Sequence, residues 1–156
     1  MKPSILVVCM GNICRSPTGE AVLKFSANRR EIDLEVDSAG TIGFHEGASP
    51  DPRAQQAAEA RGYSFSGMSA RQVTDADFYR FDMILAADED NLSDLKLRCP
   101  EHLQSKLSLF LSHGGASETE IPDPYYGGEQ GFERVLDLIE EAAERVLDEV
   151  ERVVSK

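Results

Sequence analysis

Short apolar runs alternate with segments of helical character along the whole chain. The apolar runs predict four strands, at residues 5–8, 33–38, 81–86 and 106–111. Segments with helix start and stop signals lie between them, at residues 16–29, 52–61, 75–80 and 88–99. Strands that alternate with helices form βαβ units around a buried parallel sheet. The pattern therefore predicts an α/β fold. Because no linker or repeat interrupts it, residues 1–156 are expected to form a single domain.

The C-terminal segment carries the clearest helical pattern in the sequence. Its apolar residues recur at helical spacing: Phe132, Val135, Leu136, Ile139, Ala142, Ala143, Val146, Val150, Val153 and Val154. The other face of this segment is acidic, so we expect a helix that packs one side on the core. Two long loops are predicted where the regular pattern stops, at residues 41–52 and 118–131.

The first apolar run leads into Cys9-Met10-Gly11-Asn12-Ile13-Cys14-Arg15-Ser16-Pro17. We expect the strand to deliver the Cys9 thiol to a tight loop, after which Ser16 caps a helix that has Pro17 at its first position. Backbone N–H groups of such a loop and the positive end of the helix attract a phosphate-like dianion. The same field favours the thiolate, which is the nucleophilic form of cysteine. The segment therefore predicts a phosphate-binding loop after the first strand, with a nucleophile at its floor.

Five residues separate Cys9 from Arg15. A loop of this length can surround three phosphate oxygens and still let a guanidinium reach them, and the planar fork of arginine can bind two oxygens at once. The plainer alternative is a buried cysteine at a strand end and a surface arginine at a helix start. Gly11, the helix start and the preceding strand each fit the phosphate loop, so we favour a cysteine-dependent phosphatase.

Composition and charge narrow the class of partner. The chain has 16 Lys and Arg against 28 Asp and Glu, a formal net charge of −12, which argues against nucleic acid or an anionic membrane surface. No apolar run approaches the roughly 20 residues of a membrane span. Three cysteines without a disulfide pattern favour free thiols in a reducing compartment, the cytoplasm. The three histidines have no metal-ligand spacing with cysteines or carboxylates, so we expect no metal or other cofactor.

Two motifs, residues 9–17 and Asp123-Pro124-Tyr125-Tyr126-Gly127, stand in the order found in the low-molecular-weight protein tyrosine phosphatases, which this chain resembles. The resemblance extends to residues 37–41, 70–74 and 88–92. It implies a three-layer α/β/α fold with a four-stranded parallel sheet. It also implies metal-independent hydrolysis of phosphotyrosine proteins and small aryl phosphates, and a loop that accepts phosphate, vanadate or a similar oxyanion.

The resemblance assigns roles to residues of both motifs. Cys9 resembles the nucleophile that forms a phosphocysteine intermediate, and Arg15 resembles the clamp on the phosphoryl oxygens, strongest in the transition state. Asp123 resembles the general acid for the leaving phenolate and then the base for the water that frees phosphate. Ser16 resembles the hydroxyl that stabilises the departing thiolate. Substrate contacts are also expected from the loop residues Met10, Gly11, Asn12, Ile13 and Cys14 and from Ser16.

Asn12 is expected to have a positive φ, which asparagine tolerates better than most residues. In the family its side chain is tied to a serine, here matched by Ser38, and a histidine usually completes the network. This chain has Ser66-Gly67-Met68-Ser69 at the corresponding place, without a histidine and with one additional residue. Ser66 or Ser69 is therefore the candidate to replace it.

Apolar side chains are expected around the site. Tyr125 and Tyr126 follow the proposed acid, and with Phe44, Met10 and Ile13 they can form a slot for a phenyl ring, deep enough to select phosphotyrosine over phosphoserine. The two tyrosines also resemble phosphorylation sites of the family and are candidates for weak self-association. Relatives that act on phosphoarginine carry threonine at the position of Ile13, so isoleucine favours an aryl phosphate.

Four further residues have structural and functional interpretations. Cys14 can form a disulfide with Cys9 on oxidation, which would protect the nucleophile, or it is only a small buried loop residue. Cys99 is interpreted as incidental. Arg71 and Asp88 match family positions, and we interpret Arg71 as an ion-pair partner and Asp88 as a helix N-cap.

Two other function classes compete with a phosphatase. A thiol-based arsenate reductase resembles this fold and loop, but it needs two further cysteines downstream, where the chain has only Cys99, and this chain retains Asp123. A non-catalytic module that holds phosphate on Cys9 and passes it to a partner would not need Arg15 together with an acid on a distant loop. Both classes fit the sequence less well than a phosphatase.

Overall fold

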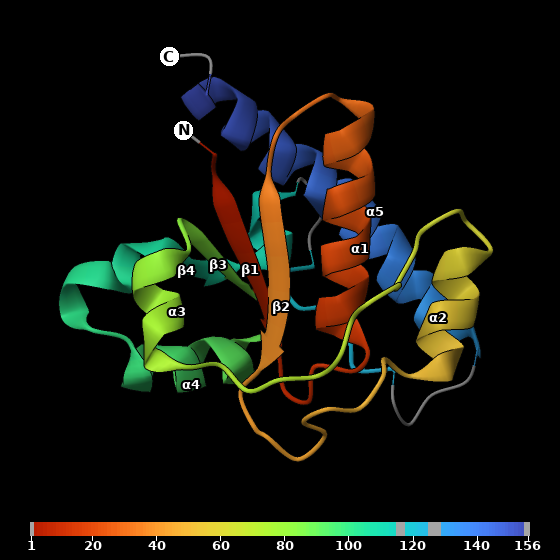
Figure 1. Ribbon diagram of the computed structural model, residues 1–156, viewed down its shortest axis with the longest axis horizontal. Coiled ribbons are helices and arrows are strands. Elements are labelled where there is room, and N and C mark those ends of the chain that lie inside the picture. Colours follow the sequence, from red (N-terminus) through yellow and green to blue (C-terminus); the bar gives the residue numbers. More distant parts are fainter. Residues whose placement is uncertain (1, 115–117, 125–128, 155–156) are drawn as a thin grey trace.

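The computed structural model describes residues 2–114, 118–124 and 129–154 (Figure 1). Within this part of the chain, four strands form one parallel sheet in the order β2-β1-β3-β4. The strands are β1 (Ser4–Cys9), β2 (Glu35–Gly40), β3 (Met83–Ala86) and β4 (Leu107–Leu109). The helices are α1 (Arg15–Arg29), α2 (Pro52–Glu59), α3 (Asp75–Arg80), α4 (Glu89–Arg98) and α5 (Glu129–Val154), with 3-10 helices η1 (Glu101–Lys106) and η2 (Phe110–His113). The predicted parallel α/β fold is confirmed.

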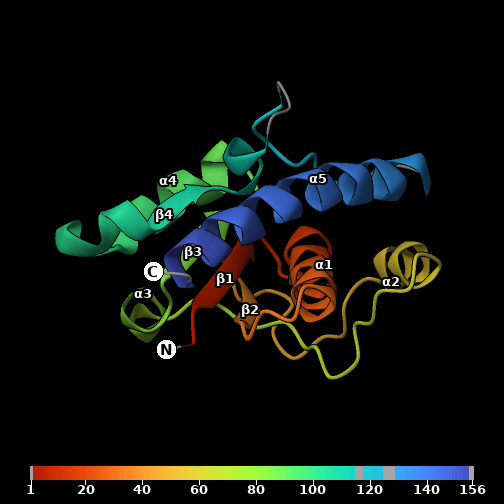
Figure 2. The ribbon, with the colours of Figure 1, turned by 90° about the horizontal axis from the view of Figure 1, so that it is seen from above.

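Helices cover both faces of the sheet, as the view from above shows (Figure 2). α1 and α5 pack on one face, with α2 beside them, whereas α3 and α4 lie on the other. The buried apolar side chains form two clusters, one on each face of the sheet. Ile5 and Val7 belong to one cluster, and Leu6 and Val8 belong to the other. Alternate residues of β1 feed the two clusters because side chains of a strand point to opposite faces. The three-layer arrangement follows from this buried central strand.

The C-terminal helix α5 buries the predicted apolar face. Phe132 and Ile139 are among its buried residues, and the stripe continues to Val150. Val153 is 70% exposed, so the apolar pattern runs past the end of the core. α5 begins at Glu129, inside the segment predicted as a loop. Neither α5 nor any other helix of the described residues is long and apolar enough to span a membrane.

Several element ends differ from the prediction. β4 has only three residues, because the chain turns into η2 at Phe110. α1 begins at Arg15, and its N-cap position is Cys14. The predicted N-cap at Ser16 is wrong, since its hydroxyl lies 3.0 Å from the sulfur of Cys9 instead of capping the helix. A contact with the last residue of β1 has taken the place of the helix cap.

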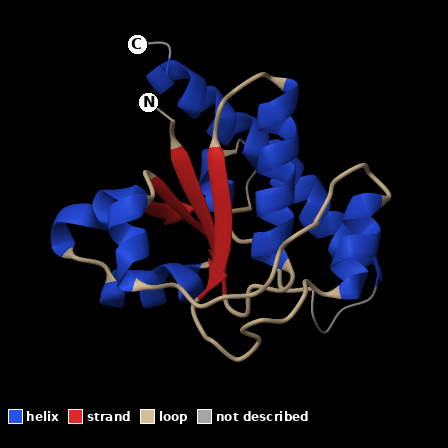
Figure 3. Ribbon diagram, in the orientation of Figure 1, coloured by secondary structure: helices blue, strands red, loops and turns tan. Residues whose placement is uncertain are grey.

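The carboxyl ends of the parallel strands meet at one edge of the sheet, where connecting loops gather (Figure 3). The loop after β2 lies beside the loop after β1, because the Ile42 N–H donates to the Met10 carbonyl at 3.1 Å. A Cβ added at Gly40 would lie 2.6 Å from the same carbonyl oxygen, so this close approach requires glycine. Ligands of open α/β sheets bind at this edge, and the candidate site lies there.

Candidate active site

Residues 9–15 curl at the end of β1 and enter α1 directly. Asn12 has a φ of 58°, as predicted. The loop is tied to its neighbours through its carbonyls, since the Asp51 N–H donates to Ile13 O at 2.8 Å. The backbone N–H groups of residues 10–14 donate to no acceptor within the described part of the chain. The loop therefore offers free N–H donors beside a helix N-terminus, an arrangement that binds anions.

The loop surrounds a pocket of about 210 Å³. The pocket is lined by Cys9, Met10, Gly11, Ile13, Cys14, Arg15, Ile42, Phe44, His45 and Asp123. It brings together the predicted nucleophile, arginine and acid, although more than one hundred positions separate the first two from the third. Ile42 and His45 were not predicted. Their position beside Phe44 in the same loop was the signal that could have identified them.

The sulfur of Cys9 lies at the floor of this pocket and is almost fully buried. It lies 3.0 Å from the Ser16 hydroxyl oxygen and 3.4 Å from the Ser16 N–H. The hydroxyl oxygen already accepts a hydrogen bond from Asn12 Nδ2 at 2.8 Å, which leaves its own hydrogen to donate to the sulfur. The side chains of Ser16 and Asn12 thus support the loop from behind and do not line the pocket, where substrate contacts were expected.

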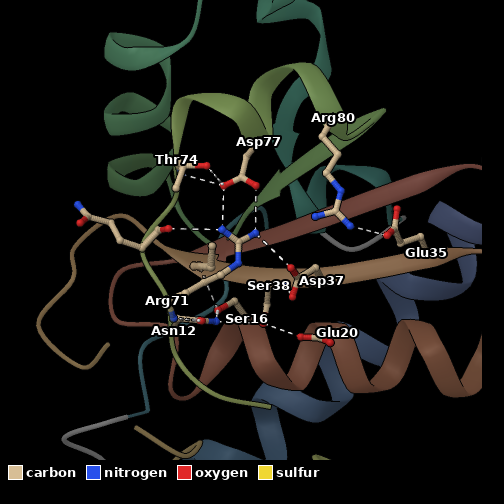
Figure 4. Close-up of polar contacts among 12 residues, drawn as sticks. Asn12, Ser16, Glu20, Glu35, Asp37, Ser38, Arg71, Thr74, Asp77 and Arg80 are labelled. Atoms are coloured by element: carbon tan, nitrogen blue, oxygen red, sulfur yellow. Dashed lines mark hydrogen bonds and ion pairs between the residues drawn. The ribbon is translucent and has the colours of Figure 1, made fainter. Parts of the chain in front are cut away.

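Asn12 is held on both sides of its amide (Figure 4). Its Nδ2 donates to Ser38 Oγ at 3.0 Å, and its Oδ1 accepts from the Arg71 N–H at 3.0 Å. Ser38 in turn donates to Glu20 Oε1 at 2.6 Å. Neither candidate serine of residues 66–69 takes part, because both are exposed. The prediction that one of them replaces the histidine is wrong, and the buried carboxylate of Glu20 completes the network.

Arg15 is buried and is held by groups of the protein itself. Its Nη1 donates to Asp88 Oδ2 at 2.7 Å and to the Ile121 carbonyl at 3.0 Å. Its Nη2 lies 3.8 Å from Asp123 Oδ2. Burial alone would lower the pKa of Arg15, but the Cys9 sulfur and the two carboxylates raise it. The guanidinium therefore stays charged among negatively charged groups.

Asp88 has a second role that the sequence did not reveal. One carboxylate oxygen caps α4 by accepting from the Asn91 N–H at 2.8 Å, as predicted, and the other binds Arg15. The available signal was its position just after β3, the neighbour of β1 in the sheet. Arg71 is an ion-pair partner as predicted, with its guanidinium between Asp77 and Asp37 (Figure 4).

Asp123 stands at the rim of the pocket with 39% of its side chain exposed. The segment before it is anchored beside the sheet, because the Ile121 N–H donates to the Ala87 carbonyl at 2.8 Å just beyond β3. A carboxylate in this position has access both to the pocket and to solvent, as a group that exchanges protons must. Tyr125 and Tyr126, predicted next to it, lie outside the described residues.

The second thiol of the loop has a different setting. Cys14 is buried, and its Sγ lies 3.7 Å from Asp51 Oδ2. Burial and the negative charges of Asp51, Cys9 and Asp123 raise the pKa of Cys14, so it stays protonated. Cys99 is also buried but does not line the pocket. Among the described residues, no group of three or more His, Cys, Asp or Glu side chains is placed to hold a metal ion.

A thiol, a guanidinium and a carboxylate around a loop with free N–H donors are the features of an α/β enzyme that acts on phosphate esters. This chain belongs to the low molecular weight phosphotyrosine protein phosphatase family, whose sequence model matches residues 4–156. The human low molecular weight phosphotyrosine protein phosphatase is 41% identical to it over 136 residues, which cover 85% of each chain. Its relatives identify it as an enzyme of the protein-tyrosine-phosphatase type.

Solved structures agree with this assignment. A protein tyrosine phosphatase from Entamoeba histolytica matches with a TM-score of 0.94 and 41% identity, over 97% of this chain and 98% of that one. The Drosophila arginine phosphatase DARP matches with a TM-score of 0.88 and 36% identity, over 96% and 98% of the two chains. The same backbone therefore serves proteins that are named for different phosphorylated residues.

Proposed function

We propose that this protein hydrolyses phosphotyrosine in proteins, and small aryl phosphates, through a phosphocysteine intermediate on Cys9. The observation that carries the proposal is the convergence of Cys9, Arg15 and Asp123 on one pocket. The thiolate supplies the nucleophile, the arginine the charge for the phosphoryl oxygens, and the carboxyl group the proton. A module that only held or carried phosphate would not need the third group.

In the first step the Cys9 thiolate attacks phosphorus and the bond between phosphorus and the phenolic oxygen breaks. Asp123, in its acid form, gives its proton to the leaving oxygen. Arg15 and the free N–H groups of the loop bind the three non-bridging oxygens, whose charge spreads in the transition state. Because Asp88 already orients the guanidinium, little reorganisation accompanies this step.

In the second step a water molecule attacks the phosphocysteine. Asp123, now a carboxylate, takes a proton from the water, and the bond between sulfur and phosphorus breaks to release phosphate. The departing thiolate of Cys9 receives the hydrogen bond of Ser16, 3.0 Å away. A hydrogen bond to a charged group is worth more than one between neutral groups, so Ser16 lowers the barrier of the step in which sulfur leaves.

The pocket wall supports an aryl substrate. Met10, Ile13, Ile42 and Phe44 give it an apolar lining, and Phe44 is 83% exposed at the mouth. Phosphoarginine is the second candidate, because the fold is shared with a protein of that activity. We expect the parent to favour a phosphotyrosine peptide over a phosphoarginine peptide, and Ile13→Thr to move the ratio of kcat/KM toward phosphoarginine. An unchanged ratio would show that Ile13 does not determine the preference between the two substrates.

The decisive experiment is hydrolysis of an aryl phosphate, with chelator present, by the parent and by Cys9→Ser, Arg15→Ala and Asp123→Ala. Cys99→Ser, Arg29→Ala and Asp90→Ala are matched controls that lie off the pocket. Turnover by Cys9→Ser would refute the mechanism. Asp123→Ala is expected to slow substrates with poor leaving groups much more than those with good ones; equal losses would refute its acid role. We further propose a cytoplasmic location, where the three thiols stay reduced.

A further inference from the structure

The carboxylate of Glu20 lies under the phosphate loop, one helical turn after Ser16 on α1. Its side chain is only 5% exposed. It accepts a hydrogen bond from Ser38 Oγ at 2.6 Å and pairs with Lys24 Nζ at 2.5 Å. A buried carboxylate is costly unless it is paired and hydrogen-bonded, and Lys24, half of whose side chain is exposed, supplies the positive charge. The two residues form a pair at one end of the network behind the loop.

The hydrogen bonds of this network can run in only one direction. Asn12 Oδ1 accepts from the Arg71 N–H, so the amide nitrogen faces the two serines and gives one hydrogen to Ser16 and one to Ser38. Each serine oxygen therefore accepts from Asn12 and sends its own hydrogen onward. That of Ser38 goes to Glu20. That of Ser16 goes to the sulfur at 3.0 Å, ahead of a carbonyl at 3.4 Å.

An ionised carboxylate accepts hydrogen bonds and cannot donate them. While Glu20 is ionised, the Ser38 hydroxyl points away from Asn12 and keeps a lone pair for its amide. If Glu20 became a donor, Ser38 would turn its hydrogen toward the Asn12 amide, and two donors would face each other. Lys24 pairs with Oε2 of this carboxylate, which leaves Oε1 directed at Ser38 as the acceptor of its hydrogen bond.

We propose that Glu20 and Lys24 are positioning residues. They fix the direction of the hydrogen bonds in this network and so hold the side chains of Asn12 and Ser16 in place beneath the Cys9 sulfur. The proposal deepens the proposed function, on which its kinetic consequence rests. Its structural consequence, a rigid loop at residues 10–15, can be measured without any turnover. Glu20 and Lys24 also border a polar hollow at the surface, whose lining includes Asp37 and Arg71. Lys24 can therefore be replaced by another residue without opening the core.

The test compares Lys24→Met, which removes the charge, with Lys24→Arg, which keeps it. Arg29→Met is the matched control, because it removes an ion pair with Glu144 from the same helix but has no link to the network. Two readouts are taken: kcat and KM on an aryl phosphate, and hydrogen exchange measured by mass spectrometry. Loop exchange here means exchange at the amides that donate hydrogen bonds to the loop, those of Ser16, Ile42, Asp51 and Arg71. For Lys24→Met we expect kcat to fall about two- to tenfold, the change expected from the loss of one hydrogen bond, and KM to change little. Loop exchange is expected to accelerate by a similar factor.

Lys24→Arg is expected to match the parent in both readouts, and so is Arg29→Met. If Lys24→Met also matched the parent, the inference would be wrong. It would be equally wrong if exchange in Lys24→Met rose as much in β3 as in the loop, because the effect would then be general destabilisation. If the parent did not hydrolyse aryl phosphates but its loop exchange still responded to Lys24→Met alone, the proposed function would fail and the positioning pair would stand.

Discussion

The carboxylate of Asp88 holds the guanidinium of Arg15 at 2.7 Å, between the ends of two neighbouring strands. Arg15 follows β1, and Asp88 follows β3. The second oxygen of Asp88 caps α4 through Asn91, so the carboxylate cannot rotate away from the arginine without releasing the helix. The orientation of the Arg15 guanidinium is therefore determined by the sheet and the helix cap.

Replacement of Asp88 separates its two roles. Asparagine caps helices about as well as aspartate, so Asp88→Asn is expected to keep α4 while it weakens the hold on Arg15. We expect kcat/KM on an aryl phosphate to fall about tenfold or more, in line with a hydrogen bond to a charged group. Asp90→Asn, at an exposed carboxylate in the same turn, is the control. Thermal unfolding checks that both variants are folded, and a fully active Asp88→Asn would contradict the proposed role.

The loop from Cys9 to Arg15 could be predicted because its requirements are local. A strand, a cysteine, a short turn and an arginine stand in order along the chain, and Asn12 takes the positive φ expected of it. The two-face pattern of α5 is local in the same sense. In both cases each residue's role depends on near neighbours, so the order of residue types carries the information.

The remaining features depend on residues that meet only after folding. Ser16 looked like a helix cap, but the sulfur seven positions earlier takes its hydroxyl. Glu20 carried no expectation in the sequence analysis, because Ser38, which donates to it, comes from β2. Asp88 kept the cap that the sequence predicted and gained a partner 73 positions away. Tertiary contacts of this kind leave no spacing pattern in the sequence.

Gly40 is the point where β2 touches the phosphate loop. A methyl group there would meet the Met10 carbonyl oxygen at 2.6 Å and two further backbone atoms at 3.1 Å. Because backbone atoms cannot turn aside, Gly40→Ala is expected to displace the loop and lower kcat on an aryl phosphate by an order of magnitude or more. Gly114→Ala is the control, since its nearest neighbours would lie at 3.5 Å. If both variants were equally active, the close approach would not matter for the site.

Cys14 is expected to protect the nucleophile against peroxide. Oxidation by hydrogen peroxide converts the Cys9 thiolate to a sulfenic acid. The Cys14 thiol gives its proton to Asp51, 3.7 Å away, as its sulfur attacks, and the sulfenic oxygen leaves as water with that proton when the disulfide forms. We expect the oxidised parent to recover most of its activity with a dithiol, whereas Cys14→Ala recovers little because its sulfenic acid oxidises further. Cys99→Ala is expected to recover like the parent. Equal recovery by Cys14→Ala would contradict the protective role.

Asp77 makes the stability of the protein depend on pH. Burial alone would raise the pKa of Asp77, but hydrogen bonds from the Arg71 guanidinium and the Thr74 N–H lower it below the usual 3.8. The folded state therefore binds a proton at Asp77 less readily than the unfolded chain. The resulting stabilisation is present above pH 3.8 and is lost as the pH falls through the lower folded-state value.

Asp77→Asn is expected to lower the free energy of unfolding at neutral pH by about 1–3 kcal/mol, the cost of weakening the two hydrogen bonds from the Arg71 guanidinium to a buried carboxylate. The difference from the parent is expected to shrink as the pH is lowered below 4, because the parent then loses the same charge. Urea unfolding at a series of pH values measures both quantities. Asp75→Asn, at an exposed position of the same helix, is expected to follow the parent throughout. A constant difference between Asp77→Asn and the parent down to acid pH would show that the carboxylate of Asp77 contributes through its shape and not through its charge.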